Sequence, residues 1–403
     1  MDERRRVTCS SASVCVGGGL CVQERSGRPV AAANKLAALE WGAVTLALPT
    51  PSVAELQARF RELHPRQRQV GLDDELFEWF EDERTQAADR AVGEGSIPAC
   101  RRLARAGVPP GSRPRLWATA LCIPPTMFTD VSHFEALCAE VENRQLLTDY
   151  LVAADVEANI APQEDYFLFE ERIRCVLLAF TRDPAVAAMC AVPPHPQLVG
   201  MGKGGRRHGT YPPSAVLPFA GLALLAGPLC YLYAEAAQLY HAFRALYCRH
   251  WCRLHSFAVD PAGGPAGAPA LPGLCRAFEA LLQEVEPEIC WHLLSIQCPP
   301  LRIAFPWMAR AFVGYLQMDQ VLLLWDRVVG YDSLMPLAMM AAAIMAFRRE
   351  ILLAAERYEE VKDVMDDLSQ MKVAPLLQGL MVSSALGPRE QLRKSSFSVP
   401  LDA

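Results

Sequence analysis

Apolar residues recur every three or four positions along most of this chain, from Gly107 to near its C-terminal end. That spacing puts them on one side of an α-helix, whereas a half-buried strand needs strict alternation of apolar and polar residues. No run alternates over the length of a strand, so we predict an all-α fold with little or no sheet. One such helix face consists of Trp307, Met308, Ala311, Phe312, Tyr315 and Leu316.

Interruptions of this pattern divide the chain into four parts. Residues 1–50 are rich in Gly, Ser, Ala and Arg without a sustained period, and we expect them to be disordered or loosely ordered. Residues 51–97 are expected to form short N-terminal helices, the first capped by Ser52 and Glu55, and then a polar linker over residues 82–100. Residues 98–385 are expected to form the main helical domain, and residues 386–403 are expected to be a disordered tail.

Two apolar runs raise the question of a membrane protein. Thr210–Ala234 carries no charged side chain and reaches the ~20 residues that a membrane span requires, whereas Ser333–Phe347 is too short. We expect both runs to be buried helices of a large core, and we keep a multi-span membrane protein as a remote alternative. Helix breakers interrupt the longer run, namely Pro212, Pro213, Pro218, Gly221, Gly227 and Pro228.

Charge and cysteine content narrow the functional class. The net charge of −6 and the pI near 5.8 argue against a nucleic-acid partner, which requires a basic face. The 14 cysteines are irregularly spaced, which is typical of free thiols in a reducing compartment and predicts a cytoplasmic protein. Cys248, His250, Cys252 and His255 lie close together but without a second ligand pair, so we expect no metal site and no cofactor.

Three stretches resemble the TBC domain, the domain of Rab GTPase-activating proteins. Gly107–Trp117 is similar to the family's opening G-[IV]-P step followed by R-x-x-x-W. Ile173–Pro184 resembles the helix that ends in L-x-A-[YF]-x-x-x-x-P, and Trp307–Asp326 resembles the late W-x-x-x-x-F and I-W-D signatures. Their order and spacing also match, and the residues after Trp307 are most similar to the subgroup around TBC domain family member 19. The resemblance implies a TBC-type helical domain with a small helical N-terminal extension.

The matching residues also have an ordinary structural interpretation. Three tryptophans are expected to anchor the core, and Arg113 and Asp326 are expected to tie helices together through a buried polar contact. None of these residues needs to touch a substrate, so the resemblance predicts a fold more directly than an activity. The structural residues of the three stretches are Gly107, Pro109, Arg113, Trp117, Trp307, Trp325 and Asp326.

The activity of this family depends on two side chains. An arginine supplied to the GTPase stabilises negative charge on the transferring phosphoryl group and is worth ~10³–10⁵ in rate. The family supplies this arginine from I-x-x-D-x-x-R and a water-positioning glutamine from Y-x-Q. We call these two side chains the fingers.

Neither finger is present at the position that the resemblance indicates. The counterpart of the first motif retains Asp155, but Ala158 occupies the arginine position. For the second motif, Tyr211 is the best match, and Pro213 then occupies the glutamine position. Arg206 and Arg207, in the adjacent loop, are the substitutes that a flexible loop could deliver.

Two functions follow, and the sequence leaves both open. The first is a regulator similar to a GTPase-activating protein, which binds a Rab-family small GTPase in its GTP form and is not itself the hydrolytic enzyme. The second is a non-catalytic TBC module, a pseudo-GAP that docks a GTPase or a trafficking partner as a scaffold. In both cases we expect membrane contact only through the GTPase, and no nucleic acid.

Overall fold

The chain is almost entirely helical where its structure is described. The computed structural model describes residues 52–61, 78–191, 201–202, 205–206, 211–255 and 270–383. Within these ranges the only β-structure is one short antiparallel ladder, in which Met201 pairs with Arg206 and Gly202 with Gly205. The prediction of an all-α fold is confirmed.

Most of the described residues lie in helices of one to four turns. The α-helices are α1 (Val53–Arg59), α2 (Glu78–Gly93), α3 (Ile97–Ala106), α4 (Arg113–Ala120), α5 (Pro125–Thr129), α6 (Ser132–Asn143), α7 (Leu147–Asn159), α8 (Glu170–Arg182), α9 (Ala185–Met189), α10 (Ala236–Arg249), α11 (Leu271–Val285), α12 (Pro287–Ser295), α13 (Pro300–Ala309), α14 (Met318–Tyr331), α15 (Met335–Phe347), α16 (Arg349–Ala354), α17 (Tyr358–Asp366) and α18 (Val373–Ser383). The 3-10 helices are η4 (Pro110–Ser112), η5 (Phe167–Phe169), η6 (Ala223–Leu225), η7 (Gly227–Tyr231) and η8 (Trp251–Arg253), and the strands are β1 (Met201–Gly202) and β2 (Gly205–Arg206).

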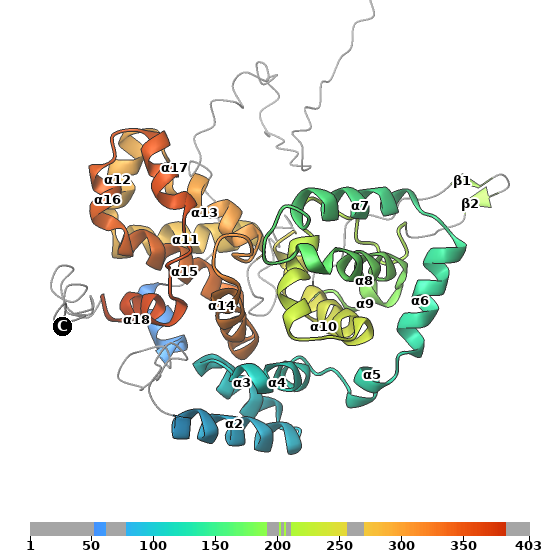
Figure 1. Cartoon of the computed structure of the whole chain (residues 1–403). Coiled ribbons are helices and arrows are strands. Elements are labelled where there is room, and N and C mark those ends of the chain that lie inside the picture. Colours follow the sequence, from blue (N-terminus) through green and yellow to red (C-terminus); the bar gives the residue numbers. More distant parts are fainter. Residues whose placement is uncertain are drawn as a thin grey trace, which may run out of the picture.

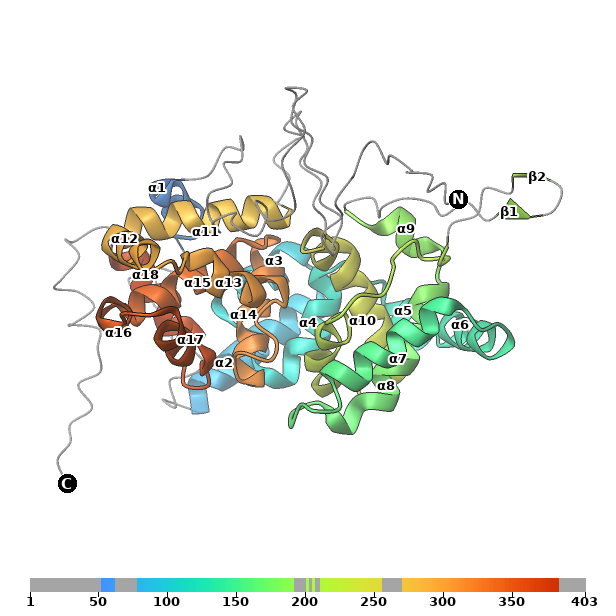
Figure 2. The same cartoon turned by 90° about the horizontal axis from the view of Figure 1, so that it is seen from above.

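The helices form two groups that lie side by side (Figures 1 and 2). In the first group α8 is central and packs against α6, α7 and α10, while in the second group α15 packs against α11, α13 and α18. Helices α2, α3 and α4 lie along one edge of both groups, and α3 packs along α14. The N-terminal helices therefore join the two groups.

Gly330 allows α3 and α14 to approach each other closely. A Cβ at this position would lie 2.6 Å from the backbone nitrogen of Arg105, a distance that real side chains do not adopt. The Arg105 side chain instead reaches back, and its Nε donates to the carbonyl of Gly330 at 3.0 Å. The close packing of α3 along α14 thus depends on a glycine near the end of α14.

A cluster of indole rings fills the junction. The Trp325 ring lies 6.5 Å from that of Trp117 and 4.8 Å from that of Trp251. Trp307 lies apart from this cluster, with its ring 6.2 Å from that of Phe312, and Trp251, which the sequence did not single out, completes the cluster. All four indoles are buried.

A buried ion pair lies next to this cluster. The Asp326 carboxylate accepts from Arg113 Nε and Nη2, each at 3.0 Å, and from the Trp117 indole at 2.7 Å. The backbone amide of Val108 is a further donor, at 3.0 Å. Arg113 and Asp326 therefore link the start of α4 to the middle of α14, as their place in the two outer stretches predicts.

Two expectations from the sequence need correction. Residues 82–100 are not a linker, because they form most of α2 and the start of α3, and the small residues Ala88, Ala91 and Cys100 are buried. Thr210–Ala234 is buried over much of its length but is not a helix of the predicted kind. Its prolines and glycines limit regular structure to η6 and η7, whereas Ser333–Phe347 does form the buried helix α15.

No helix within the described ranges combines the length and the low charge that crossing a bilayer requires. The segments expected to be disordered, 1–50 and 386–403, lie outside the described residues. The proposed domain limits at residues 98 and 385 remain predictions.

Candidate functional site

The site is built around Asp155, on the inner side of α7. Its carboxylate accepts from the backbone amides of Gly221 at 2.5 Å and Ala223 at 2.7 Å, and from Asn159 Nδ2 at 2.7 Å. Burial raises the pKa of Asp155 above its usual value, although these donors and the positive charge of Arg310 act in the opposite direction. The aspartate thus fastens the segment that begins η6 onto α7.

Gly221 is required at this junction by its backbone conformation. Its φ is +97°, in the region that residues with a side chain rarely adopt. The turn presents its amide to Asp155 and leaves the preceding residue, Ala220, exposed. On α7, Ala158 follows Asp155 by three positions and is exposed as well. Two exposed methyl groups therefore flank the Asp155–Gly221 contact, one from each segment.

Pro213 lies elsewhere, near the other end of α7. Tyr211 accepts, through its hydroxyl, a hydrogen bond of 2.8 Å from the amide of Leu147, the first residue of the helix. At 1.5 Å per residue, Leu147 and Ala158 are about 16 Å apart along the helix axis. The structure does not bring Pro213 and Ala158 together.

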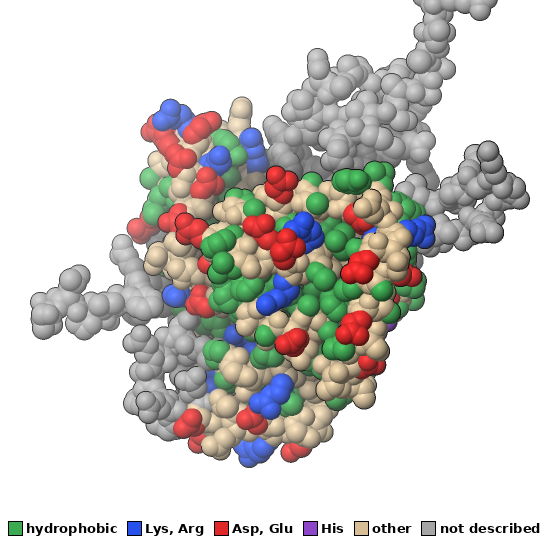
Figure 3. Space-filling view, turned by 45° about the vertical axis from the view of Figure 1, so that its right-hand side comes forward, with side chains coloured by type: hydrophobic (Ala, Val, Ile, Leu, Met, Phe, Trp, Pro, Cys, Tyr) green, Lys and Arg blue, Asp and Glu red, His purple; other side chains and the backbone are tan. Residues whose placement is uncertain are grey.

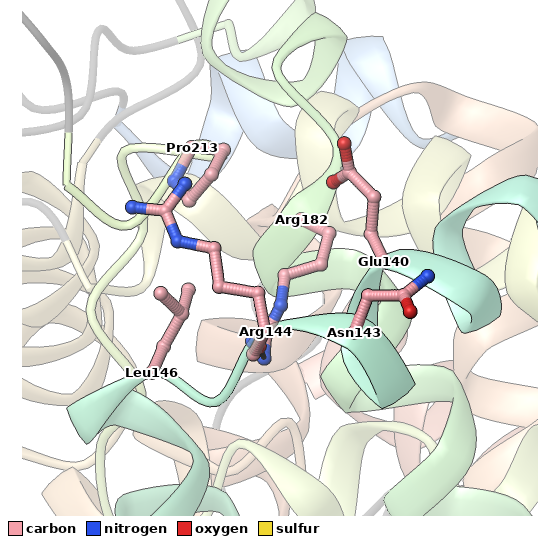
Figure 4. Close-up of a pocket in the computed structure, with 6 residues that line it drawn as sticks. All are labelled: Glu140, Asn143, Arg144, Leu146, Arg182 and Pro213. Carbon is pink, nitrogen blue, oxygen red and sulfur yellow. Dashed lines mark hydrogen bonds between the residues drawn. The ribbon is translucent and has the colours of Figure 1, made fainter.

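A small pocket of about 120 Å³ surrounds Pro213 (Figure 4). Arg182, in its wall, is buried and already paired, because its Nη1 and Nη2 lie 2.5 Å and 2.7 Å from the Asp149 carboxylate. The Arg144 side chain is exposed, and its guanidinium extends toward Pro213 in Figure 4. The pocket is lined by Glu140, Asn143, Arg144, Leu146, Arg182 and Pro213.

The other arginines near these segments do not form a second site. On α8, Arg174 pairs with Glu171, and the Arg172 guanidinium lies 5.6 Å from the ring centroid of Phe169. The side chain of Arg206 and all of Arg207 lie outside the described residues, so their proposed role remains a prediction.

The outer face of α7 is apolar. Leu147 and Tyr150 are 74% and 69% exposed, and Leu151 is 48% exposed. Ala154 and Ala158 continue the same face at helical spacing and are also exposed. We call these five residues the α7 apolar face. Figure 3, turned toward the side of the molecule that carries α7, shows exposed hydrophobic side chains interspersed with acidic and basic ones. Exposed leucine and tyrosine side chains at helical spacing thus form an apolar patch on the surface of α7.

Two polar residues that the sequence did not single out lie close to the Asp155 end of α7. Arg310 follows α13 directly, and its charge acts on Asp155. Gln163 follows α7, and its Oε1 would lie 3.9 Å from a Cβ placed on Gly314. No local sequence signal connects Arg310 to α7, because the two lie together only in the folded chain.

No three His, Cys, Asp or Glu side chains among the described residues gather closely enough to hold a metal ion.

Comparison with known proteins identifies the family of this architecture. Residues 219–353 match the Rab-GTPase-TBC domain family, a range that begins next to Ala220 and excludes Pro213. The chain is similar to human TBC1 domain family member 19, with 39% identity over 345 residues, which cover 84% of this chain and 64% of that protein. A TBC domain-containing protein kinase-like protein of Dictyostelium discoideum is 32% identical over 88 residues, 22% of this chain and 8% of that protein.

A solved structure has the same fold. The flagellar RabGAP TBC domain of Chlamydomonas superposes with a TM-score of 0.50 over 84% of this chain and 97% of that domain, at 13% identity. Gly221, Trp307 and Asp326 all lie within the residues that match the family. Residues 219–353 therefore belong to the Rab-GTPase-TBC family, and the chain spans less than two thirds of the length of its human relative.

Proposed function

We propose that this chain is a regulator of Rab-family small GTPases that binds the GTP form through the α7 apolar face. The observation that carries this proposal is the exposed apolar face itself, on the helix that holds the finger-motif aspartate Asp155. Burying one exposed leucine on binding is worth roughly 1.5–3 kcal/mol, so a few of these side chains suffice for a specific contact.

In this proposal Ala220, and not Pro213, is the residue that corresponds to the glutamine finger of the family. Asp155 of the first motif accepts a hydrogen bond from the amide of Gly221. Ala220 directly precedes Gly221, so this hydrogen bond also keeps Ala220 close to α7. Ala220 and Ala158 are both exposed, as finger residues must be to reach a bound GTPase. Pro213, by contrast, lies near Leu146 at the start of α7.

Alanine at both positions favours the non-catalytic module as the second candidate. A methyl group can neither stabilise phosphoryl charge nor orient water, and an arginine finger alone is worth ~10³–10⁵ in rate. Docking does not depend on those two side chains, so binding is the part of the function that both candidates share. We place this binding in the cytoplasm, with membranes reached through the GTPase.

The test is a titration of the full chain with a panel of Rab proteins loaded with GTP analogue or with GDP. We expect at least one GTP-loaded member to bind at least ~10-fold more tightly than its GDP form. Leu151→Glu should weaken that binding at least ~10-fold, since a charge would have to be buried in the contact.

Leu294→Glu on α12 is the matched control, because Leu294 is 44% exposed and lies on the other helix group. This variant should bind as the unchanged chain does. The proposal is wrong if no member of the panel binds, or if the two leucine variants behave alike.

A further inference from the structure

The turn between α13 and α14 is unusually fixed. Ala311 and Phe312 are fully buried and adopt φ values of +47° and +66°, which cost energy in residues with a side chain. The carbonyl of Ala311 accepts from the Trp325 indole at 3.0 Å, and the Phe312 amide donates to Trp307 at 2.8 Å. The Trp325 indole and the backbone carbonyl of Trp307 therefore hold this turn in place.

Arg310 projects from this fixed turn into solvent. Its side chain is exposed, and its guanidinium lies 5.9 Å from the ring centroid of Tyr315. No carboxylate of the described residues lies within 4 Å of it, so the guanidinium is not engaged in an ion pair there. Arg310 thus has a backbone held by the fixed turn and a guanidinium group that is accessible from solvent.

The same turn faces the end of α7. Gly314 lies opposite Gln163, whose Oε1 is 3.9 Å from the position of a glycine Cβ. Figures 1 and 2 both show the C-terminal end of α7 close to the segment that precedes α14. An arginine whose charge acts on Asp155 and a glutamine that follows α7 therefore lie near the C-terminal end of the helix that carries Ala158. These are the two residue types missing from the finger positions.

We propose that Arg310 supplies the guanidinium that Ala158 lacks, and that Gln163 supplies the carboxamide that Ala220 lacks, to the nucleotide of a bound Rab GTPase. The proposal rests on the proposed function, because it requires a GTPase docked on the α7 apolar face. It makes the protein an activator whose finger arginine comes from the second helix group instead of from α7.

The chemistry requires no change in either side chain. A water oxygen bonds to the γ-phosphorus, the bond from that phosphorus to the bridging oxygen breaks, and GDP and inorganic phosphate leave with the protons of the water. Arg310 keeps its protons and stabilises the negative charge on the phosphoryl group. Gln163 orients the attacking water and also remains unchanged.

The surrounding charge favours a nucleotide already held by a GTPase over a free one. Glu157, Glu164 and Asp165 are exposed near the same end of α7, and together they repel a free triphosphate. In a docked GTPase, the lysine and the magnesium ion of the GTPase already compensate the negative charge of the nucleotide phosphates. We therefore expect no measurable binding of free GTP to the chain.

The experiment is single-turnover hydrolysis by a GTP-loaded Rab, with the full chain in excess and the dissociation constant measured in parallel. We expect acceleration of at least ~100-fold over the Rab alone, by analogy with other arginine fingers. Arg310→Ala should abolish nearly all of the acceleration and change the dissociation constant less than ~3-fold. Arg310→Lys should lose most of it too, because an ammonium lacks the planar fork of donors.

Arg302→Ala is the matched control, since Arg302 is also exposed and lies 4.0 Å from a tyrosine ring, that of Tyr358. It should retain full acceleration, whereas Gln163→Ala should lose at least ~10-fold. Binding without acceleration, or an Arg310→Ala variant as active as the Arg302→Ala variant, would overturn this inference and leave the proposed function intact. Absence of binding to every Rab would instead overturn the proposed function.

Discussion

Replacing Asp326 by alanine should destabilise the domain far more than removing an exposed ion pair. The Asp326 side chain is fully buried and its partner Arg113 is 5% exposed, so Asp326→Ala leaves a buried guanidinium without its counter-charge. The change also removes the acceptor of the Trp117 indole and of the Val108 amide. Breaking a buried pair in this way costs about 3–5 kcal/mol, a large part of the ~5–15 kcal/mol that stabilises a typical domain.

Urea unfolding followed by tryptophan fluorescence measures this cost, because Trp117 and Trp325 lie next to the pair. Asp89→Ala is the control, since Asp89 and its partner Arg115 are 47% and 64% exposed and such pairs contribute about 0–1 kcal/mol. Adding Arg113→Met to Asp326→Ala should restore part of the loss, because no unpaired charge then remains buried. A loss for Asp326→Ala no larger than that for Asp89→Ala would refute the reasoning.

Three further predictions concern other parts of the molecule. Gly330→Ala should lower the free energy of unfolding by at least ~1–3 kcal/mol, measured by urea titration, because the new Cβ meets the backbone of α3 at Arg105; no loss would contradict the close packing of α3 on α14. Burial raises the pKa of Glu279 from 4.5 to about 7, although the positive charge of Arg276 acts in the opposite direction. Ionising this carboxyl group therefore lowers the free energy of unfolding as the pH rises from 4.5 through 7. Glu279→Gln should therefore stabilise the protein more at pH 8 than at pH 5 in thermal unfolding, and an equal effect at both values would contradict that pKa. Ala158→Arg in an Arg310→Ala background should restore Rab-stimulated hydrolysis at least ~10-fold, and no gain would argue against Ala158 as a finger position.

The fold could be predicted because its main determinants are local. Helical spacing around Trp307 and the order of the three TBC-like stretches indicate the architecture without any knowledge of contacts. The Arg113–Asp326 pair was also foreseeable, since each residue belongs to a stretch with a matching family pattern. The polar character of residues 82–100 was misleading, because this segment of α2 and α3 buries only small residues, namely Ala88, Ala91 and Cys100.

The candidate site was harder to predict, because it depends on contacts between distant segments. Tyr211 suggested Pro213 as the second finger position, and only the hydrogen bond from Gly221 to Asp155 brings Ala220 beside α7. Arg310 and α7 are separated along the chain by most of the domain, so no spacing rule could connect them. The positive φ of the turn after Arg310 was equally invisible, since alanine and phenylalanine do not signal it.

Hydrogen exchange on the full chain, with and without a Rab loaded with a non-hydrolysable GTP analogue, tests the proposed docking face most directly. Exchange of backbone amides should slow in residues 147–159 and 219–225, where the α7 apolar face and the Asp155–Gly221 contact lie. Unchanged exchange in both segments while the Rab is bound, or protection confined to α12 and α16 in the second group, would contradict docking on α7.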